Sequence, residues 1–356
     1  MTSNCRKTKT TFLTLVLLLA ISALVSAQDE ITELEFAQPP DSGSNESRTL
    51  QSMVKVLGTD GPCHGGLYLL THSGDRKDLF QTENQKMIDN PLIDQTWRYC
   101  SVFSATTGNS VTAGRNFDNQ NVGSIIISLY RPPDGYSSIS FSRAIELGFG
   151  LNLDLERFRS SEMGNRLLLA PFYATDGINE HGLVVGLAGV KQITHEAKDG
   201  AGLVFVTFMV RKILDQARNI EEAMNVVEKS IPFDADKNSL NTHFFIVDAT
   251  GRSVTLEYDQ DQWRRIHGDK SWQVLTNKPI FEVPDADLRE KCWRYRSISE
   301  TLEKTQGNIE WKAGMKILQD VTQEGTTWSV IYSPTTKDVY FSVYQNWDTV
   351  YHLTVP

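Results

Sequence analysis

The stretch Cys100-Ser-Val-Phe-Ser-Ala-Thr-Thr-Gly-Asn-Ser-Val-Thr-Ala-Gly-Arg-Asn-Phe-Asp118 has the residue pattern of a β-hairpin. Two strand-like segments flank a turn at Thr106-Thr-Gly-Asn109. A hairpin brings the beginning of its first strand beside the end of its second. The sequence therefore predicts that the thiol of Cys100 lies near the side chains of Arg115 and Asp118.

This predicted convergence has a chemical use. A guanidinium beside a cysteine favours the thiolate, which is the reactive form. If the chain is cut before Cys100, the same residue also carries a free α-amine, which titrates near ~8 and can act as a base without a histidine. Asp118 can hold such an amine through a charge-assisted hydrogen bond. The alternatives are an Arg115–Asp118 pair that only closes the hairpin, and a cysteine that is a small buried hydrophobe.

Elsewhere, strand-like segments come in runs and helices are grouped between them, without βαβ alternation. This order predicts a layered α+β fold with mainly antiparallel sheets. We expect strands over Leu67–Leu70, Ser124–Tyr130, Leu183–Val190, Thr242–Asp248, Ser253–Tyr258, Trp328–Tyr332 and Asp338–Tyr344, and helices over Leu203–Val227, Lys291–Leu302 and Trp311–Leu318. The polar segment Gln81–Gln95 is expected to be helix or loop.

The composition is that of a globular protein, with 356 residues of which 40% are hydrophobic. A formal net charge of −9 argues against a nucleic-acid binder, which needs a basic face. The sequence has no phosphate-binding loop, no dinucleotide fingerprint and no zinc-ligand spacing, so we expect no cofactor and no metal.

The segment Met1–Ala27 has the pattern of a secretory signal peptide. A basic start is followed by the apolar run Phe12–Leu24 and the small residues Val25-Ser26-Ala27, after which the chain becomes polar. An uncleaved anchor is the alternative, but the apolar run is short for a full span. We therefore expect export, to the medium or the periplasm, and a mature chain that does not span a membrane.

Three cysteines remain after removal of the signal peptide: Cys63, Cys100 and Cys292. An odd number in an exported protein leaves at least one thiol unpaired or bonded to another chain. The sequence leaves open whether Cys63 and Cys292 form a disulfide, and whether the protein forms a homo-oligomer.

The hairpin, from Cys100-Ser-Val-Phe to Ala-Gly-Arg-Asn-Phe-Asp118, resembles the start of the choloylglycine hydrolase family of linear amide C–N hydrolases, which includes conjugated bile acid hydrolases and penicillin V acylases. Four later segments resemble motifs of that family in the family's order: Asp176-Gly-Ile-Asn-Glu-His-Gly-Leu183, Val274-Leu-Thr-Asn-Lys-Pro-Ile-Phe281, Cys292-Trp-Arg-Tyr295 and Thr326-Thr-Trp-Ser-Val-Ile-Tyr332. The resemblance implies a four-layer αββα sandwich of the N-terminal-nucleophile hydrolase type over residues 100–356.

The resemblance also implies roles for five residues. Cys100 matches the nucleophile that forms an acyl-enzyme, Arg115 the residue beside the thiol, and Asp118 the residue that orients the α-amine. Asn277 matches an oxyanion-hole donor, which typically contributes roughly 3–4 kcal/mol. Arg294 matches a late arginine that supports the nucleophile.

Some positions depart from the family pattern or leave a choice. The spacing leaves Arg296 as a rival for the role of Arg294. Bile-acid hydrolases carry an asparagine where this chain reads Gly186-Leu-Ala-Gly189. A backbone N–H near Gly189 could still donate, and the loss puts bile-salt specificity in doubt more than hydrolysis. Cys100 is also far from the start of the chain. Cleavage before it, which could be autocatalytic, would make residues 28–99 a propeptide or a small N-terminal subunit.

Four other polar residues are candidates for a structural role or a role in the site. His243 is expected to be a satisfied structural histidine within a strand. Asp176 and Asn179 are expected to organise a turn, and Asn179 could also lie near the site. Glu257 ends a strand and could be buried or face the site.

The expected activity is hydrolysis of a small-molecule N-acyl amide. Acyl transfer to a small amine uses the same acyl-enzyme and remains an alternative. So does a non-catalytic exported binding protein that keeps the fold, although the joint presence of Cys100, Arg115, Asp118 and Asn277 argues against it. A papain-like protease would need a histidine partner that no local signature supports.

Overall fold

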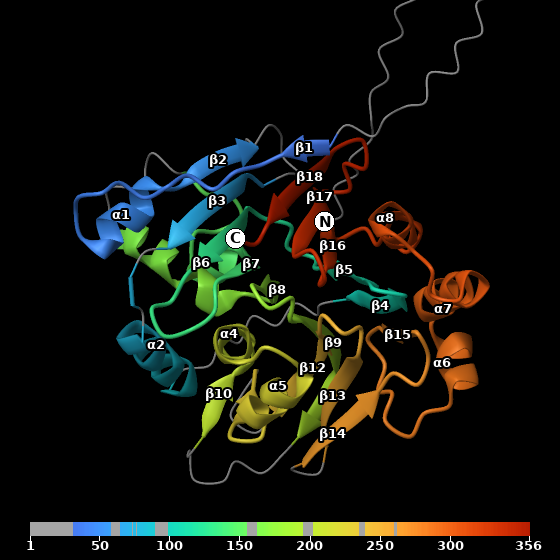
Figure 1. The fold of residues 1–356 in the computed structure, drawn as a ribbon. Coiled ribbons are helices and arrows are strands. Elements are labelled where there is room, and N and C mark those ends of the chain that lie inside the picture. The colour runs from blue at the N-terminus through green and yellow to red at the C-terminus, as the bar shows by residue number, and fades with distance from the viewer. Residues whose placement is uncertain are drawn as a thin grey trace, which may run out of the picture.

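Two β-sheets pack face to face between two outer layers of helices in the computed structural model of the chain (Figure 1). The structure describes residues 31–57, 65–72, 74–75, 77–89, 99–154, 162–194, 202–234, 239–259 and 262–356. Within these residues most strand pairs are antiparallel, so the predicted αββα sandwich with mainly antiparallel sheets is confirmed.

The first sheet carries the hairpin that contains Cys100. Its strand order is β1 (Ile31–Glu33), β18 (Val350–Thr354), β17 (Asp338–Val343), β16 (Thr326–Ser333), β5 (Ser110–Asp118), β4 (Ser101–Thr107) and β15 (Trp272–Leu275). Neighbouring strands are antiparallel except β1 and β18, which are parallel. Helices α6 (Asp285–Lys291), α7 (Trp293–Thr305) and α8 (Trp311–Asp320) lie on the outer side of this sheet.

The second sheet is longer and includes strands from before Cys100. Its order is β14 (Gln262–His267), β13 (Ser253–Asp259), β12 (Ser239–Val247), β9 (Val184–Thr194), β8 (Asp176–Asn179), β7 (Ser138–Arg143), β6 (Ile125–Tyr130), β3 (Leu67–His72) and β2 (Val54–Leu57). The short strands β10 (Leu203–Phe205) and β11 (Ile231–Phe233) form a separate parallel pair. The outer layer here comprises α1 (Asn45–Gln51), α2 (Lys77–Asp89), η1 (Ala144–Leu147), η2 (Glu162–Tyr173), α4 (Val206–Gln216) and α5 (Ile220–Val227).

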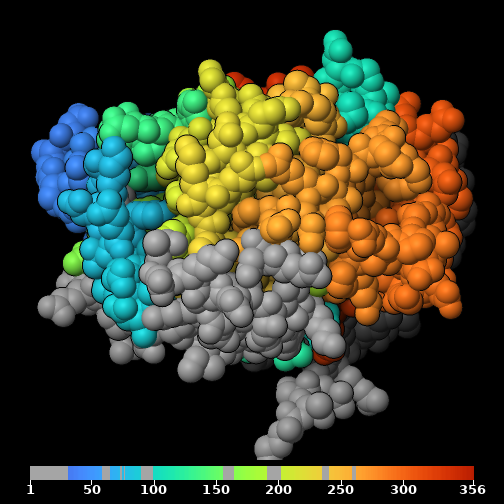
Figure 2. Space-filling model, turned by 90° about the horizontal axis from the view of Figure 1, so that it is seen from below, coloured from blue at the N-terminus to red at the C-terminus, as the bar shows by residue number. Residues whose placement is uncertain are grey.

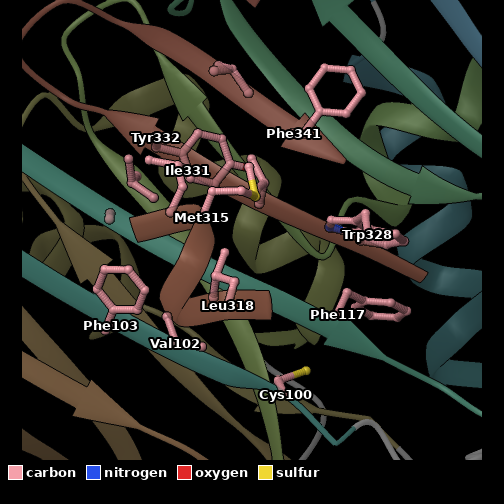
Figure 3. Close-up of a cluster of buried hydrophobic side chains, with 14 of the residues drawn as sticks. Cys100, Val102, Phe103, Phe117, Met315, Leu318, Trp328, Ile331, Tyr332 and Phe341 are labelled. Carbon is pink, nitrogen blue, oxygen red and sulfur yellow. The ribbon is translucent and has the colours of Figure 1, made fainter. Parts of the chain in front are cut away.

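Aromatic side chains join the two sheets. Phe117 of β5 stacks on Trp328 of β16 with ring centroids 4.0 Å apart, and Phe141 of β7 lies 5.8 Å from the same indole ring. Figure 3 shows buried side chains of this core, among them Phe117 and Trp328, with Cys100 at the edge of the group, immediately before β4. Cys100 therefore belongs to the wall of a packed core.

One predicted helix is divided in the structure. The expected helix over Leu203–Val227 consists of strand β10, helix α4 and helix α5. The second break has a local cause, because the side chain of Asn219 accepts a hydrogen bond from the N–H of Glu222 at 3.0 Å and caps a new helix.

The segment before Cys100 is more structured than a linker. The polar stretch up to Arg48 contains β1 and the start of α1, which is capped by Ser44. Gln81 lies in α2, whereas the predicted signal peptide and Cys63 lie outside the described residues. Cys292 is a free, buried thiol. No helix within the described ranges has the length and apolarity needed to cross a membrane.

Candidate active site

The β4–β5 hairpin forms as the sequence predicts. Residues pair from Ser101 with Asn116 to Thr107 with Ser110, and Gly108 in the turn has a φ of 56° that suits glycine. Beyond the first pair, the N–H of Tyr99 donates to the carbonyl oxygen of Asp118 at 3.0 Å. Cys100 thus lies at the end of the hairpin that also carries Arg115 and Asp118.

Arg115 reaches from the first sheet to the second. Its Nε and Nη2 donate to the carbonyl oxygen of Leu187 on β9 at 3.2 and 2.6 Å. Its Nη1 lies 2.8 Å from Oδ1 of Asp176 in a buried ion pair. Nη2 is also 3.6 Å from Sγ of Cys100. These contacts fix a positive charge beside the thiol.

Asp118 is buried at the end of β5. Its Oδ1 accepts a hydrogen bond from Oγ1 of Thr326 at 2.6 Å, while Oδ2 has no hydrogen-bond partner within the described residues. Burial raises the pKa of Asp118 to about 7, although the Thr326 hydrogen bond and the charges of Arg294 and Arg115 lower it in part. A buried carboxyl group with one oxygen atom that lacks a hydrogen-bond partner can accept a hydrogen bond from a cationic donor.

Arg294 lies at the start of α7 and connects three of the predicted residues. Its Nη1 donates to the carbonyl oxygen of Cys100 at 2.7 Å and to Oγ of Ser101 at 2.8 Å. Its Nη2 donates to Oδ1 of Asn277 at 2.6 Å, and Nη1 lies 3.8 Å from Oδ2 of Asp118. Arg296, the alternative, is exposed. The structure therefore brings Arg294, and not Arg296, to Cys100.

Asn277 follows β15, which pairs with β4. Leu275 is opposite Val102, so the antiparallel register sets Asn277 opposite Cys100 two residues further on. Its Nδ2 donates to the carbonyl oxygen of Gly189 at 2.7 Å. This contact uses the carbonyl group of Gly189 and leaves the expectation for a backbone N–H near Gly189 as a prediction. The carbonyl of Gly189 therefore holds Nδ2 of Asn277, and Arg294 holds its Oδ1.

Two polar residues differ from the sequence expectations, and a third agrees with them. Asp176 was assigned to a turn but instead pairs with Arg115 and accepts hydrogen bonds from Tyr332 and Trp328, at 3.0 and 3.3 Å. His243 is buried, yet neither ring nitrogen has a hydrogen-bond partner among the residues described. The turn expectation holds for Asn179, whose side chain accepts hydrogen bonds from the N–H groups of residues 181 and 183.

Sequence reasoning missed the contributions of Asp176, Thr326 and Glu257. Asp176 and Thr326 lie within segments that resemble the family, but their neighbours in space come from distant strands. A buried arginine needs a carboxylate partner to balance its charge, and this requirement at Arg115 could have pointed to Asp176. Glu257 is buried and accepts hydrogen bonds from backbone N–H groups of Ile280 and Phe281. In the described ranges, no three His, Cys, Asp or Glu side chains gather as metal ligands.

The sequence from Cys100 onward matches a known family. Residues 100–317 fit the profile described as linear amide C–N hydrolases, choloylglycine hydrolase family. The chain belongs to the choloylglycine hydrolase family. The matched region of this chain begins at Cys100.

Relatives of this choloylglycine hydrolase family member include penicillin V acylase from Pectobacterium atrosepticum. The two chains are 30% identical over 118 residues, which is 30% of this chain and 31% of the relative, so the match spans about a third of that protein.

Solved structures share the fold at low sequence identity. Penicillin V acylase from Agrobacterium tumefaciens aligns with a TM-score of 0.53 and 17% identity, over 72% of this chain and 86% of that chain. A variant of conjugated bile acid hydrolase from Clostridium perfringens aligns with a TM-score of 0.52 and 15% identity, over 72% and 92%. These alignments show the N-terminal-nucleophile hydrolase fold.

Proposed function

We propose that this protein is an exported hydrolase that cleaves the amide bond of a small N-acyl substrate, with Cys100 as an N-terminal nucleophile. The main support is the set of groups around Cys100. Its Sγ faces the buried guanidinium of Arg115, and its carbonyl oxygen accepts a hydrogen bond from Arg294. The carboxyl group of Asp118 lies beside the same backbone, with one oxygen lacking a described partner.

The proposed chemistry begins with cleavage of the Tyr99–Cys100 peptide bond. Sγ of Cys100 attacks the carbonyl carbon of Tyr99, so that the acyl group moves from nitrogen to sulfur. Water then hydrolyses this thioester, which leaves a carboxylate on Tyr99 and both a thiol and a free α-amine on Cys100. The side chain of Asp118 is placed to hold the resulting ammonium group.

The mature site would then act on the substrate amide. The α-amine of Cys100 takes the thiol proton, and the thiolate attacks the carbonyl carbon. The NH₂ group of Asn277 donates to the oxyanion that develops. The intermediate collapses, the leaving amine takes the proton from the ammonium group, and water hydrolyses the acyl-enzyme to release the acid. Arg115 stabilises the thiolate form throughout.

The substrate class follows from the family rather than from a pocket. The names of the relatives include a penicillin V acylase and a conjugated bile acid hydrolase. The segment Gly186-Leu-Ala-Gly189 lacks the amide side chain that the sequence comparison expects for bile salts. We therefore place N-acyl amino acids, N-acyl lactones and penicillin V before conjugated bile salts in a substrate panel.

We further propose that the segment before Cys100 stays bound after cleavage, as a small subunit. Strand β3 pairs in parallel with β6 over residues 67–72, and all six of its residues are buried. Figure 1 shows β2 and β3 as part of the second sheet, and β1 beside β18 in the first. Three of the buried residues are leucines, each of which typically contributes about 1.5–3 kcal/mol when buried.

Helix α2 is attached to the rest of the protein in the same way. The side-chain amide of Asn84 donates to the carbonyl oxygen of Leu203 and accepts from the N–H of Phe205, each at 3.0 Å. The ring of Phe80 packs against Phe172 and Phe208. In Figure 2 this segment lies directly against the yellow surface of α4 and α5. Release of the segment would expose a large apolar surface.

The decisive experiment is N-terminal sequencing and intact mass spectrometry of the purified, active protein. We expect one chain to start at Cys100, and a small cysteine-directed electrophile to label that residue and stop amide cleavage. Cys100→Ala should abolish both processing and activity. Cys292→Ala is the matched control, because Cys292 is also a buried free thiol but has no role in the scheme. An active chain with an intact Tyr99–Cys100 bond would refute the proposal.

A further inference from the structure

A buried carboxylate on the inner face of the second sheet contacts the loop that carries Asn277. Glu257 of β13 is 3% exposed. Its Oε1 accepts a hydrogen bond from the N–H of Ile280 at 2.6 Å, and its Oε2 accepts one from the N–H of Phe281 at 3.2 Å. Both donors belong to residues 276–281, called here the Asn277 loop. The carboxylate therefore holds the far end of this loop through its backbone.

The neighbouring strand adds a second contact to the same loop. Arg264 of β14 lies directly opposite Glu257 in the antiparallel pair, so the two side chains share a face of the sheet. The guanidinium of Arg264 lies 4.9 Å from the centroid of the Phe281 ring. The β13–β14 hairpin thus holds the loop by two adjacent side chains.

The near end of the loop is fixed from other elements. Arg294 donates to Oδ1 of Asn277, and the carbonyl oxygen of Gly189 accepts from its Nδ2. The position of the amide therefore depends on anchors at both ends of six residues. An oxyanion donor has to be in place before the charge develops, so loosening either end reduces its effect.

His243 contacts Glu257 as a neutral ring. Nε2 of His243 lies 3.2 Å from Oε1 of Glu257. Burial lowers the pKa of His243 to about 3, so its ring is neutral near pH 7 and does not form an ion pair with the carboxylate. Hydrogen bonds that N–H groups donate to a charged acceptor are stronger than neutral ones.

We propose that Glu257 is a positioning residue for the reaction, which holds the Asn277 loop so that the Asn277 amide meets the oxyanion. The inference rests on the proposed function, because it needs Asn277 to be the oxyanion donor. Glu257 itself touches neither the thiol nor the substrate in this scheme.

The test compares three variants with the parent enzyme: Glu257→Gln, Asn277→Ala and the control Asp248→Asn. Glutamine keeps the shape of Glu257 but has only one acceptor oxygen, so one of the two loop N–H groups loses its partner. Asp248 is another buried carboxylate, in the turn between β12 and β13, that accepts a hydrogen bond from a backbone N–H, that of Thr250, and it has no contact with the loop among the residues described. Each rate is divided by the amount of cleaved chain, measured by mass spectrometry.

Two rates separate positioning from a general structural role. The first is kcat for an acyl substrate, which passes through an oxyanion. The second is alkylation of Cys100 by iodoacetamide, which does not. We expect Glu257→Gln to lower kcat by roughly 10-fold to 100-fold, with KM and the alkylation rate within about twofold of the parent. Asp248→Asn should leave both rates within about twofold.

The outcomes distinguish the positioning role of Glu257 from the oxyanion role of Asn277. An unchanged kcat in Glu257→Gln, or an equal fall in alkylation, overturns the positioning role. An unchanged kcat in Asn277→Ala overturns the oxyanion role and the inference with it. If Glu257→Gln does not fold, Glu257→Asp provides the same readout, since the shorter carboxylate keeps its charge but cannot reach the N–H groups of Ile280 and Phe281 as before. It should lower kcat by about two- to tenfold with alkylation unchanged, and an unchanged kcat again overturns the proposal.

Discussion

Nη1 of Arg294 donates a hydrogen bond to the carbonyl oxygen of Cys100 at 2.7 Å, although 194 positions separate the two residues in the sequence. The other terminal nitrogen of the same guanidinium donates to Asn277. A single planar group thus sets the distance between the proposed nucleophile and the proposed oxyanion donor. A planar guanidinium can make both contacts in fixed directions, which a lysine cannot.

Replacement of Arg294 should therefore reduce activity strongly. Arg294→Met leaves two buried oxygen atoms without their donor, and we expect kcat/KM to fall by roughly 100-fold or more. The control is Arg296→Met, two positions away on the same helix and exposed, which should change kcat/KM by less than about twofold. Steady-state kinetics on the cleaved chain provide the measurement. Equal losses in both variants would contradict the role of Arg294.

The raised pKa of Asp118 predicts a pH-dependent stability of the uncleaved chain. Its pKa is about 7 in the folded protein against 3.8 for an ordinary aspartate, so the folded state binds the proton more tightly. The stabilisation is present at low pH and is lost as the pH rises through 7. In a Cys100→Ala background, the free energy of unfolding should fall by about 3 kcal/mol between pH 4.5 and 8 because of this group.

Urea denaturation at several pH values tests this, with Asp118→Asn as the comparison. The asparagine variant lacks the titrating group, so the difference between the two curves isolates it from other carboxyl groups such as Asp215. Parallel curves for the two proteins would show that Asp118 titrates normally. In the cleaved enzyme the α-ammonium group of Cys100 should favour the carboxylate form, and the pH effect should shrink.

The Arg115–Asp176 ion pair predicts a large cost for removing one partner. Both side chains are almost completely buried, so Asp176→Asn leaves the guanidinium charge without its counter-charge. We expect a loss of about 3–5 kcal/mol in the free energy of unfolding. Glu222→Gln breaks the exposed pair with Arg218 and should cost less than about 1 kcal/mol. Similar losses in the free energy of unfolding for the two variants would mean that the buried pair contributes no more to stability than the exposed one.

Retention of the N-terminal segment can be measured directly. After cleavage, the two chains should elute together in size-exclusion chromatography under native conditions and separate in guanidinium chloride. The buried strand β3 and the aromatic contacts of Phe80 provide the reason. Separate elution of an active large chain under native conditions would show that residues 28–99 act as a propeptide only.

The convergence of residues at Cys100 could be predicted from the sequence because the hairpin geometry is local. The alternation and turn between Cys100 and Asp118 fix a hairpin, and the hairpin brings Arg115 to the thiol. Asn277 and Arg294 were found through resemblance alone, since no periodicity relates them to Cys100. The structure brings all five residues together.

The parts that sequence reasoning missed depend on contacts between the sheets. Asp176 and Glu257 lie on strands of the second sheet, and their partners come from β5 and from the loop after β15. No spacing rule reports such distant pairs. The long apolar stretch from Leu203 also satisfied a helical pattern, although pairing with residues 231–233 turns its first three residues into a strand.

The parallel pairing of β3 with β6 has a consequence for the lifetime of the protein. Before processing, both strands belong to one polymer and find each other by intramolecular search. After processing they would belong to separate molecules, so a denatured enzyme could regain its shape only through a concentration-dependent encounter. Loss of activity on heating should then be irreversible at high dilution, and the unfolding rate would govern durability. Once its two chains have unfolded and separated, such an enzyme would not refold to the active form.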